Sequence, residues 1–466
     1  MYERTRVHPV EVNDDLLAPV FGRASARLWI PAGVLGIVIL AGLGGLFLAA
    51  TQGLGRLGYT HTQMWTVQIV NFAYFAGVSH AGIMLTAVLR LTQAEWRRPV
   101  TRCAEILTLF ALLAAAIYPF SHTGRPWRTA YWLVPYDFSR DIWPNVRSAL
   151  IWDAVALTTY LISSAFFVYL TLVPDLAVIR DRSTGWRRRI YGALAIRFRG
   201  SERQWRLQKV AGVLLPTMIL AVFVSDHSAV AWDFSMALVP GWHVTSFGPY
   251  FVAGSIYSGV SAVVLVMAML RWTLRLDQYL TQDHFDAIGR LLIPVALIWF
   301  FFLLTDLYFG LASGDAVELA IWELRLFSPE WGPLWLAMLV SALLIPLPIW
   351  SIRALRRQPV VMFLGAALVS IGLYLERYIL VITPLSFKHP FVFTWVTGYS
   401  LSVTEVLIIL MSVAIIALGV LVFARILPII PIYDVKESQV LARRLRIGQV
   451  SVPAVVRATA AEEIMP

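Results

Sequence analysis

Ten long apolar segments dominate this chain, and they restrict it to one class of fold. Hydrocarbon offers no water to backbone N–H and C=O groups, so apolar segments of about 20 residues cross a membrane as helices. The sequence therefore predicts an all-α, multi-pass membrane protein with about ten transmembrane helices. We expect the spans at about 29–50, 65–90, 102–121, 147–173, 209–226, 247–270, 287–309, 332–352, 359–382 and 402–426.

The composition agrees with this class and suggests three regions. The chain is 59% hydrophobic and only 14% charged, with a mean hydropathy of +0.71, which exceeds what a soluble domain needs. Residues 1–28 are polar and show no cleavage-site pattern, so the first span is expected to remain as an anchor. We expect a cytoplasmic segment at 1–28, a membrane domain at 29–427 and a cytoplasmic tail at 428–466.

The distribution of positive charge predicts the orientation. The two termini and the even-numbered connections hold about 30 of the 38 Lys and Arg residues. The positive-inside rule therefore predicts that both termini lie in the cytoplasm. The most basic connection, 174–208, suits a helix on an anionic membrane surface or serves orientation alone. The net charge of +10 does not predict nucleic-acid binding, because no binding module accompanies it.

The connections on the other side are aromatic and poor in charge. They are residues 123–146, 227–246 and 310–331, the last with a short amphipathic helix around Asp315–Leu326. Two interpretations stay open. These loops are an aromatic belt at the membrane interface, or a docking surface for a protein partner.

A faint internal repeat predicts how the helices group. Span two carries Gly77 and Gly82 after a Tyr-Phe pair, and span six carries Gly254 and Gly259 in the same arrangement. Spans two to five and spans six to nine are therefore expected to form two four-helix bundles, with spans one and ten as peripheral helices. The glycines would let neighbouring helices approach closely.

Ionisable residues inside apolar spans are costly and mark functional sites. His122 ends the third span and Asp153 lies within the fourth, so both side chains are expected near the outer interface. An imidazole beside a carboxylate can accept and relay protons, which a quinol must lose as it is oxidised. Asp226 and His227 at the end of the fifth span are expected to complete this quinol-binding cluster.

Other polar residues in the spans are candidates for a proton path. An Arg377–Asp306 ion pair is the simplest neutralising arrangement, and Glu376 is expected to need a partner separate from that of its neighbour Arg377. His80 serves as a proton conduit or as a hydrogen-bonded contact between helices. The full set of candidates is Asn71, His80, Asp306, Tyr308, Glu376, Arg377 and Glu405.

The sequence predicts no redox cofactor held by this chain. Its single cysteine, Cys103, excludes an internal disulfide, a cysteine-linked haem and a cysteine-held iron–sulfur cluster. Of its eight histidines only His80 lies well inside an expected span, so we expect no haem and no metal. Such a chain can bind a quinone, but a partner has to carry the electrons.

Several stretches resemble a known family. Residues 71–82, 89–99, 226–243 and 249–254 are similar to the NrfD/polysulfide-reductase family of quinone-interacting membrane subunits, and most of all to the larger membrane subunit of alternative complex III. The resemblance extends from about the first span to the tenth.

The resemblance implies a quinol:acceptor oxidoreductase subunit that oxidises quinol, expected to be menaquinol, near the periplasmic face. It implies three partners, namely an iron–sulfur subunit that takes the electrons, a multihaem cytochrome c and a second homologous membrane subunit. The His and Asp of the family's quinol pocket fall on His122 and Asp153. Proton translocation is proposed for the family.

Two alternatives remain beside this interpretation. One is the membrane anchor of a molybdopterin-type complex similar to polysulfide reductase. The other is a secondary transporter, which would carry ionisable residues at mid-depth in broken helices.

Overall fold

The structure, a computed structural model, describes most of the chain. The described residues are 9–23, 26–60, 63–128, 138–143, 146–147, 149–242, 246–387, 399–440, 444–447 and 450–453. Tyr131, Trp132 and Tyr136, which contribute to the aromatic character of the third connection, lie outside them.

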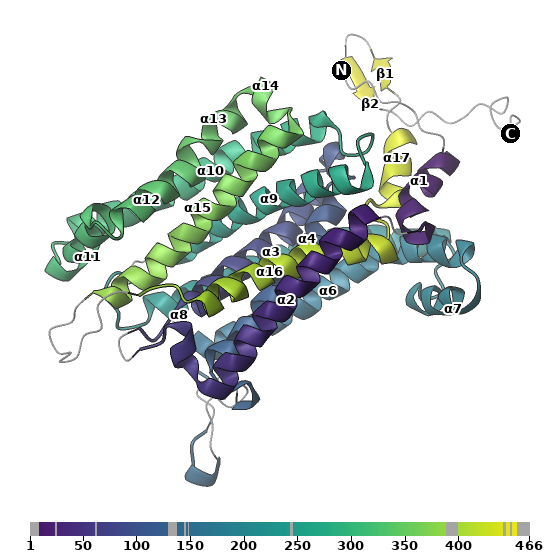
Figure 1. Cartoon of the computed structure of the whole chain (residues 1–466). Helices are drawn as coiled ribbons and strands as arrows, with labels where there is room; N and C mark the ends of the chain where they lie inside the picture. Colours follow the sequence, from purple (N-terminus) through teal and green to yellow (C-terminus); the bar gives the residue numbers. More distant parts are fainter. Residues whose placement is uncertain are drawn as a thin grey trace, which may run out of the picture.

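The described part of the chain has ten helices that are long and apolar enough to cross a membrane, which confirms the predicted class (Figure 1). They are formed by α2 (Ala26–Gln52), α3 (Val67–Leu91), α4 (Thr101–His122), α6 (Ala149–Arg182), α8 (Glu202–Ser235), α9 (Phe247–Leu274), α10 (Gln282–Ala312), α12 (Gly332–Leu339) with η5 (Val340–Leu344) and α13 (Pro346–Ser351), α15 (Pro359–Ser386) and α16 (Val403–Ile426). The shorter elements are α1 (Pro9–Phe21), η1 (Leu54–Leu57), η2 (Glu95–Arg97), η3 (Pro126–Arg128), η4 (Phe138–Arg140), α7 (Gly185–Leu194), α11 (Ala316–Phe327), α14 (Arg353–Arg356) and α17 (Ile432–Val440).

The long helices form two bundles with matching internal contacts. In the first, α3 packs on α4 and α8, and α6 packs on the same two helices. In the second, α9 packs on α10 and α15, and the α12–α13 span packs on the same two helices. The bundles meet mainly where α3 crosses α9, with α8 and α15 beside that contact. This arrangement agrees with the predicted pairing of spans two to five and six to nine.

The first and last spans form a peripheral pair. Helix α2 lies along α16, with Gly42 so close to Met411 that a Cβ at position 42 would lie 2.4 Å from the Met411 Cβ (Figure 1). Only 17% of the apolar window of α2 is buried within the chain. The pair therefore presents a mainly apolar surface, as a helix facing lipid does.

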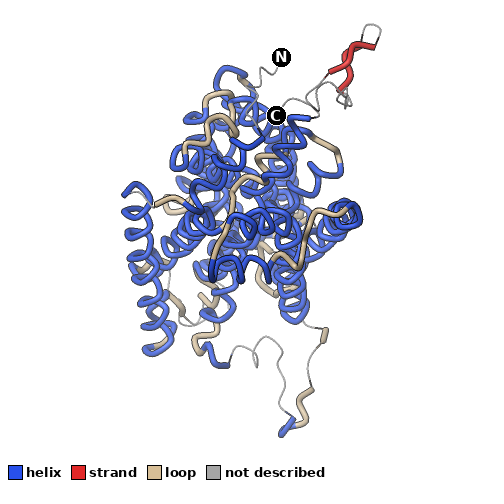
Figure 2. The backbone as a smooth tube through the Cα atoms, turned by 90° about the vertical axis from the view of Figure 1, so that its right-hand side faces the viewer, coloured by secondary structure: helices blue, strands red, loops and turns tan. Residues whose placement is uncertain are grey.

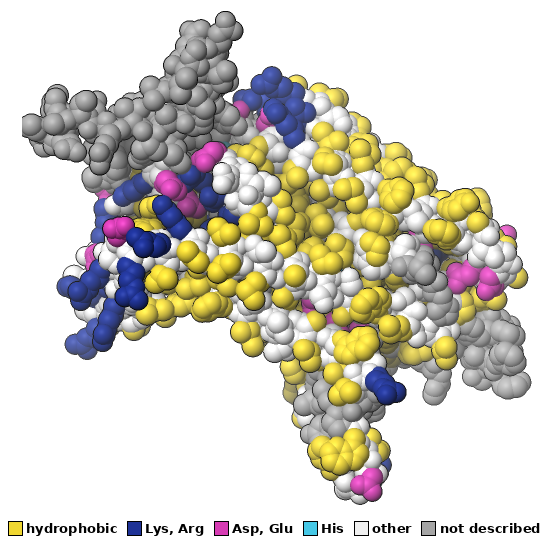
Figure 3. All heavy atoms as spheres, turned by 180° about the vertical axis from the view of Figure 1, so that it is seen from behind, with side chains coloured by type: hydrophobic (Ala, Val, Ile, Leu, Met, Phe, Trp, Pro, Cys, Tyr) yellow, Lys and Arg dark blue, Asp and Glu magenta, His cyan; other side chains and the backbone are white. Residues whose placement is uncertain are grey.

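The two ends of the molecule differ in charge. One end, called the basic end below, carries α1, α7 and α17, and the opposite end carries α11 (Figure 1). Arg and Lys side chains gather at the basic end, and apolar side chains cover the middle (Figure 3). A small antiparallel hairpin of β1 (Arg444–Ile447) and β2 (Val450–Pro453) lies in the tail outside the helical body, with Arg444 opposite Pro453 (Figure 2).

Two helices are longer than the apolar pattern predicts, and the difference changes the site. The apolar pattern ends the fifth span at Asp226, but α8 continues to Ser235. The polar pair Asp226–His227 does not end the helix, because both side chains are buried against other helices. Helix α6 likewise runs on to Arg182, so the basic connection contains a helix end and the separate helix α7.

The predicted amphipathic helix near residue 315 is confirmed. Helix α11 begins after Asp315, whose carboxylate accepts a hydrogen bond of 2.8 Å from the backbone N–H of Val317. This is an ordinary N-cap. The helix buries Ile321, Trp322 and Arg325 against its neighbours α10, α12 and α15.

Candidate functional site

A histidine and an aspartate meet at the centre of the first bundle. His80 Nε2 of α3 contacts the carboxylate of Asp226 on α8, and their side chains are 0% and 1% exposed. The Nδ1 atom of His80 contacts the carbonyl of Ala76, which can only accept, so Nδ1 carries a proton. His80 Nε2 is therefore the ring atom that faces the Asp226 carboxylate.

Aromatic and polar rings enclose this pair. The ring of Tyr160 on α6 stacks on the His80 imidazole with centroids 4.0 Å apart. The His227 ring lies 5.3 Å from that of His80, and its Nε2 contacts the hydroxyl of Ser255 on α9. Four helices thus contribute polar groups to one buried cluster, which reaches the interface between the bundles.

Close packing at Gly77 makes this cluster possible. A Cβ at position 77 would lie 2.6 Å from Ser255 Oγ and 3.4 Å from the His227 ring. Gly259 on α9 is in a similar position, because a Cβ there would lie 2.1 Å from the Cβ of Ala81 on α3. The repeated glycines therefore serve the predicted purpose of close approach between helices.

A second acidic group lies beside the pair. Asp153 on α6 is 7% exposed and interacts electrostatically with Asp226 and Asp233, both on α8. One carboxylate oxygen each of Asp153 and Asp233 is buried without a hydrogen-bond partner among the described residues. Buried carboxylates close to one another favour sharing protons. This arrangement can hold more than one proton between α6 and α8.

Within the described residues, His122 makes no contact with Asp153. It ends α4, and its Nδ1 lies 2.7 Å from the hydroxyl of Tyr59 in the connection between α2 and α3. Burial raises the pKa of Tyr59, so the phenol stays protonated and donates to His122. The expected pair is thus divided between two places among the described residues, His122 with Tyr59 and Asp153 with the aspartates of α8.

The second bundle has its own charged cluster, and it differs from the expectation. Arg377 Nη1 contacts the neighbouring Glu376 carboxylate at 2.9 Å, and Arg377 Nη2 donates to the carbonyl of Phe251 at 3.3 Å. The predicted pairing of Arg377 with Asp306 is therefore wrong. Glu376 does have partners apart from Arg377, because its carboxylate also interacts with the side chains of Tyr250 and Trp299. The long arginine side chain bends back to the adjacent carboxylate, and both groups are 3–4% exposed.

Asp306 faces a different arginine. The guanidinium of Arg325 on α11 interacts electrostatically with Asp306, and both residues are 3% exposed. Burial lowers the pKa of Arg325, and the nearby Asp306 carboxylate opposes that shift. Tyr308, another proton-path candidate, is 66% exposed and does not line this buried cluster.

Two further candidates have local structural roles. Asn71 accepts a hydrogen bond of 2.7 Å from the Tyr374 hydroxyl, which joins α3 to α15. Glu405 forms a capping box with Ser402 at the start of α16 and also accepts a hydrogen bond from Tyr399. These contacts account for Glu405 by capping, whereas the amide nitrogen of Asn71 is buried without a hydrogen-bond partner among the described residues.

A narrow crevice connects the two bundles at this level. Its volume is about 170 Å³ counted between atoms, without room for a water-sized sphere. It is lined by Ala73, Tyr74, Gly77, Gly254, Ser255, Ser258, Leu373, Glu376 and Arg377. The crevice therefore joins the Glu376–Arg377 pair to the residues that surround His227.

Sequence reasoning missed Tyr59, Tyr160, Asp233, Ser255 and Arg325, although two of them had a readable signal. Tyr160 lies seven residues after Asp153, and Asp233 lies seven residues after Asp226. A spacing of seven places both members of each pair on one helix face. Because the fifth span was predicted to end at Asp226, Asp233 was assigned to a loop and not considered. Nothing in the sequence marked Arg325 as a site residue except that it is the single Lys or Arg in its connection.

No group of three or more His, Cys, Asp and Glu side chains within the described residues is arranged to hold a metal ion. The buried groups have the chemistry for proton exchange, because acids and imidazoles from α3, α6 and α8 lie close together away from water.

Comparisons with known proteins find sequence similarity to subunits of reductases. The sequence model of a family described as "Polysulphide reductase, NrfD" matches residues 57–387, which hold both four-helix bundles and leave out α2 and α16. The chain is 24% identical over 241 residues to a putative dimethyl sulfoxide reductase membrane subunit of Halobacterium salinarum. This match covers 52% of the chain and 51% of the relative, so the chain spans about half the length of that protein.

A second relative is covered more fully. The chain is 20% identical over 368 residues to a selenate reductase subunit of Mesobacillus selenatarsenatis, which covers 76% of the chain and 82% of the relative. Both relatives carry the names of reductase subunits.

Proposed function

The chain belongs to the polysulphide reductase NrfD family, and on this basis we propose that it is the quinone-reactive membrane subunit of a molybdopterin-type reductase complex. The names of both relatives support this interpretation, which the sequence left as an alternative, more than they support alternative complex III. Family membership also argues against a secondary transporter. The partner would be a catalytic subunit with molybdenum and iron–sulfur centres, at the outer face of a bacterial inner membrane.

The observation that carries the proposal is the buried contact between His80 and Asp226. Oxidation of a quinol releases two electrons and two protons, and reduction of a quinone takes up the same numbers. The electrons pass to or from a metal centre of the partner. In this proposal one proton is exchanged at the His80–Asp226 pair and the other at Asp153, with Asp233 beside it.

The other predicted residues enter the proposal with separate tasks. His227, held by Ser255, would orient the quinone headgroup beside the pair. His122 with Tyr59 would form a second proton-accepting position at the end of α4. The Glu376–Arg377 pair, which reaches the same region through the crevice, would belong to a path for protons.

The test is Asp226→Asn in the purified complex with a quinol or quinone substrate. Asn keeps the shape of the side chain but cannot take a proton, so turnover should fall by about 10²–10⁴-fold. Asp277→Asn is the matched control, because Asp277 is 62% exposed at the basic end and pairs with Arg271. Near-normal turnover in the Asp226 variant, with quinone still bound, would refute the assignment.

A second candidate is the quinol-oxidising subunit of alternative complex III. Residues 226–243 favour it, because they resemble the larger membrane subunit of that complex. The subunits that co-purify with the native protein decide between the two. A molybdenum-containing subunit selects the reductase, whereas a multihaem cytochrome c with a second homologous membrane subunit selects alternative complex III.

A further inference from the structure

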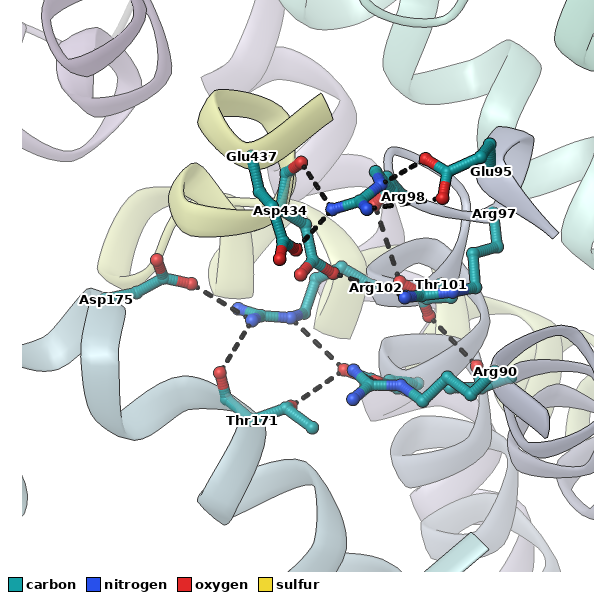
Figure 4. Close-up of polar contacts among 12 residues, drawn as sticks. Arg90, Glu95, Arg97, Arg98, Thr101, Arg102, Thr171, Asp175, Asp434 and Glu437 are labelled. Carbon is teal, nitrogen blue, oxygen red and sulfur yellow. Dashed lines mark hydrogen bonds and ion pairs between the residues drawn. The ribbon is translucent and has the colours of Figure 1, made fainter. Parts of the chain in front are cut away.

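A cavity of about 360 Å³ lies at the basic end, far along the helices from the acidic cluster at His80. It is bounded by the ends of α3 and α4, the short helix η2, the second half of α6, the first half of α8, and α17 (Figure 4). One side of its wall is charged and the other is apolar. The function proposed above makes no use of it.

Two of its arginines each contact two carboxylates, although Arg102 Nε has no well-aligned hydrogen-bond acceptor among the described residues. Arg98 donates to Glu95 at 2.9 Å and to Glu437 of α17 at 2.6 Å. Arg102 is 0% exposed, and its guanidinium lies 3.0 Å from Asp175 and 3.2 Å from Glu105 (Figure 4). These contacts are compact enough to account for both charges.

The other two arginines are poorly satisfied. The guanidinium groups of Arg90 and Arg97 approach the carboxylates of Glu105 and Asp434 only to 3.6 Å. Neither guanidinium donates a hydrogen bond within the described residues, and Arg90 Nε and Arg97 Nη1 are buried without a partner. Both side chains are only 17–18% exposed. Buried guanidinium donors without acceptors are uncommon in native structures.

The apolar side of the cavity belongs to the membrane-spanning helices. Phe167 and Leu170 of α6 and Leu215 of α8 form it. Arg90 extends across this side, with its charge 5.5 Å from the Phe167 ring and Nη1 3.4 Å from where a Cβ would stand at Gly212. The unsatisfied donors are therefore placed where a polar group attached to an apolar chain would fit.

The rim has the character of a membrane interface. Trp205 stacks on Tyr433 with centroids 4.1 Å apart, which fixes α17 against the start of α8. The exposed Lys209 lies one turn further along α8. Tryptophan, tyrosine and lysine are typical of the level of lipid headgroups.

We propose that this cavity binds a phosphate group through Arg90 and Arg97. Guanidinium groups match phosphate oxygens in pairs of hydrogen bonds, and basic pockets between membrane helices bind lipid headgroups. The apolar wall fits the acyl chain of a phospholipid, and free phosphate shares the same recognised group. A phosphate group bound in the cavity would supply the hydrogen-bond acceptors that the guanidinium groups of Arg90 and Arg97 lack.

The first experiment measures phospholipid retained by the purified complex. After detergent exchange, lipid phosphorus is extracted and counted per complex for the native protein, Arg90→Gln, Arg97→Gln and Arg97→Lys. Arg353→Gln is the control, because Arg353 is an exposed cation at the same end outside the cavity. The two glutamine variants should lose the tightly held phospholipid, and the lysine variant, which keeps the charge without the forked donors, should retain part of it.

The second experiment distinguishes the two sources of phosphate. Delipidated complex is titrated with radiolabelled inorganic phosphate and, in parallel, reconstituted in nanodiscs of phosphatidylglycerol. Retention of phospholipid identifies a lipid, whereas saturable binding of inorganic phosphate alone, weakened about tenfold or more in Arg90→Gln, identifies a soluble source. Quinone turnover of each variant reports whether it is folded. Folded glutamine variants that match the native protein in both assays would overturn the proposal.

Discussion

His80 and Asp226 depend on each other more than on any other group around them. Their side chains are 0% and 1% exposed, so water cannot replace either partner. Removal of one member of such a pair typically costs about 3–5 kcal/mol, whereas an apolar replacement of both is often near neutral. The test of this interaction therefore needs the double variant as well as the single one.

We predict that His80→Leu lowers the stability of the membrane subunit by about 3–5 kcal/mol, because the buried Asp226 carboxylate is left without its His80 partner. The double variant His80→Leu/Asp226→Leu should recover most of that loss while remaining inactive. Denaturant unfolding of the purified subunit in detergent measures both. Additive losses in the double variant would show that the two residues do not interact.

The Tyr59–His122 contact predicts a dependence on alkaline pH. Burial raises the pKa of Tyr59 above its ordinary value of 10.0, so the folded state holds the phenolic proton more tightly than the unfolded state does. The stabilisation is then complete below pH 10.0 and is lost as the pH rises towards the folded-state pKa. Tyr59→Phe should therefore flatten the fall of the melting temperature above about pH 10. Equal slopes in the variant and the native protein would contradict this assignment.

At the residue scale, sequence reasoning reached the polar residues that interrupt apolar spans. Asp153 and Asp226 stand out because a carboxylate in a hydrophobic run has to have a partner, and the structure places both in one cluster. The partners themselves could not be read from the sequence. Which arginine faces Asp306 depends on how α11 folds back, and nothing local distinguishes Arg325 from Arg377.

At the scale of elements, close crossings decide where the polar residues meet. Helices α3 and α9 touch at Gly259, where a Cβ would lie 2.1 Å from the Cβ of Ala81 and 2.9 Å from the Val78 carbonyl. The same crossing brings Ser255 to His227. The spacing of the glycines predicted the contact, because small residues mark helix interfaces in membranes. It did not predict which helix each glycine would meet.

We predict that Gly259→Ala destabilises the membrane subunit by about 1–3 kcal/mol, because the added methyl group forces α3 and α9 apart. Gly44→Ala is the control, since a Cβ at position 44 meets nothing within 4 Å. Thermal unfolding of both variants in detergent gives the comparison. A Gly259 variant as stable as the control would mean that the crossing adjusts without cost.

Helix ends were the least predictable elements. The expected end of the fifth span at Asp226 followed from the loss of apolar residues, but α8 continues for two more turns because its polar residues are buried against α3 and α9. Burial is a property of the assembled bundle, so a single segment cannot reveal it. The amphipathic pattern around Asp315–Leu326, by contrast, is local and predicted α11, which spans Ala316–Phe327.

At the scale of the whole molecule, two similar bundles hold different chemistry. The first contains the His80–Asp226 pair with further acids, and the second contains the Glu376–Arg377 ion pair and the electrostatic interaction of Asp306 with Arg325. The family match covers both bundles and ends before α16. The peripheral pair α2–α16 thus extends a common framework, and it lies beside the first bundle through the contact of α16 with α4.

The end of the molecule that carries α11 has exposed apolar side chains. These side chains either contact a partner protein or lie in the interfacial layer of the membrane. Leu238 is 95% exposed, Met236 58% and Phe327 79%, whereas Phe234 and Trp242 from the same connection are buried. The aromatic-belt interpretation requires contact with lipid headgroups, and the docking interpretation requires a protein partner that excludes water. Electron transfer favours docking, because a quinone site without its own metal centre needs one close by.

We therefore predict that residues 236–242 and 313–331 exchange backbone hydrogens more slowly in the whole complex than in the isolated chain, because a partner protein covers them. Helix α7 at the basic end is the internal control, since its residues are mostly exposed and far from the proposed docking surface (Figure 1). Hydrogen–deuterium exchange with both samples in the same detergent makes the comparison. Equal exchange of both segments in the two samples would place the partner elsewhere and leave these side chains to the aromatic belt.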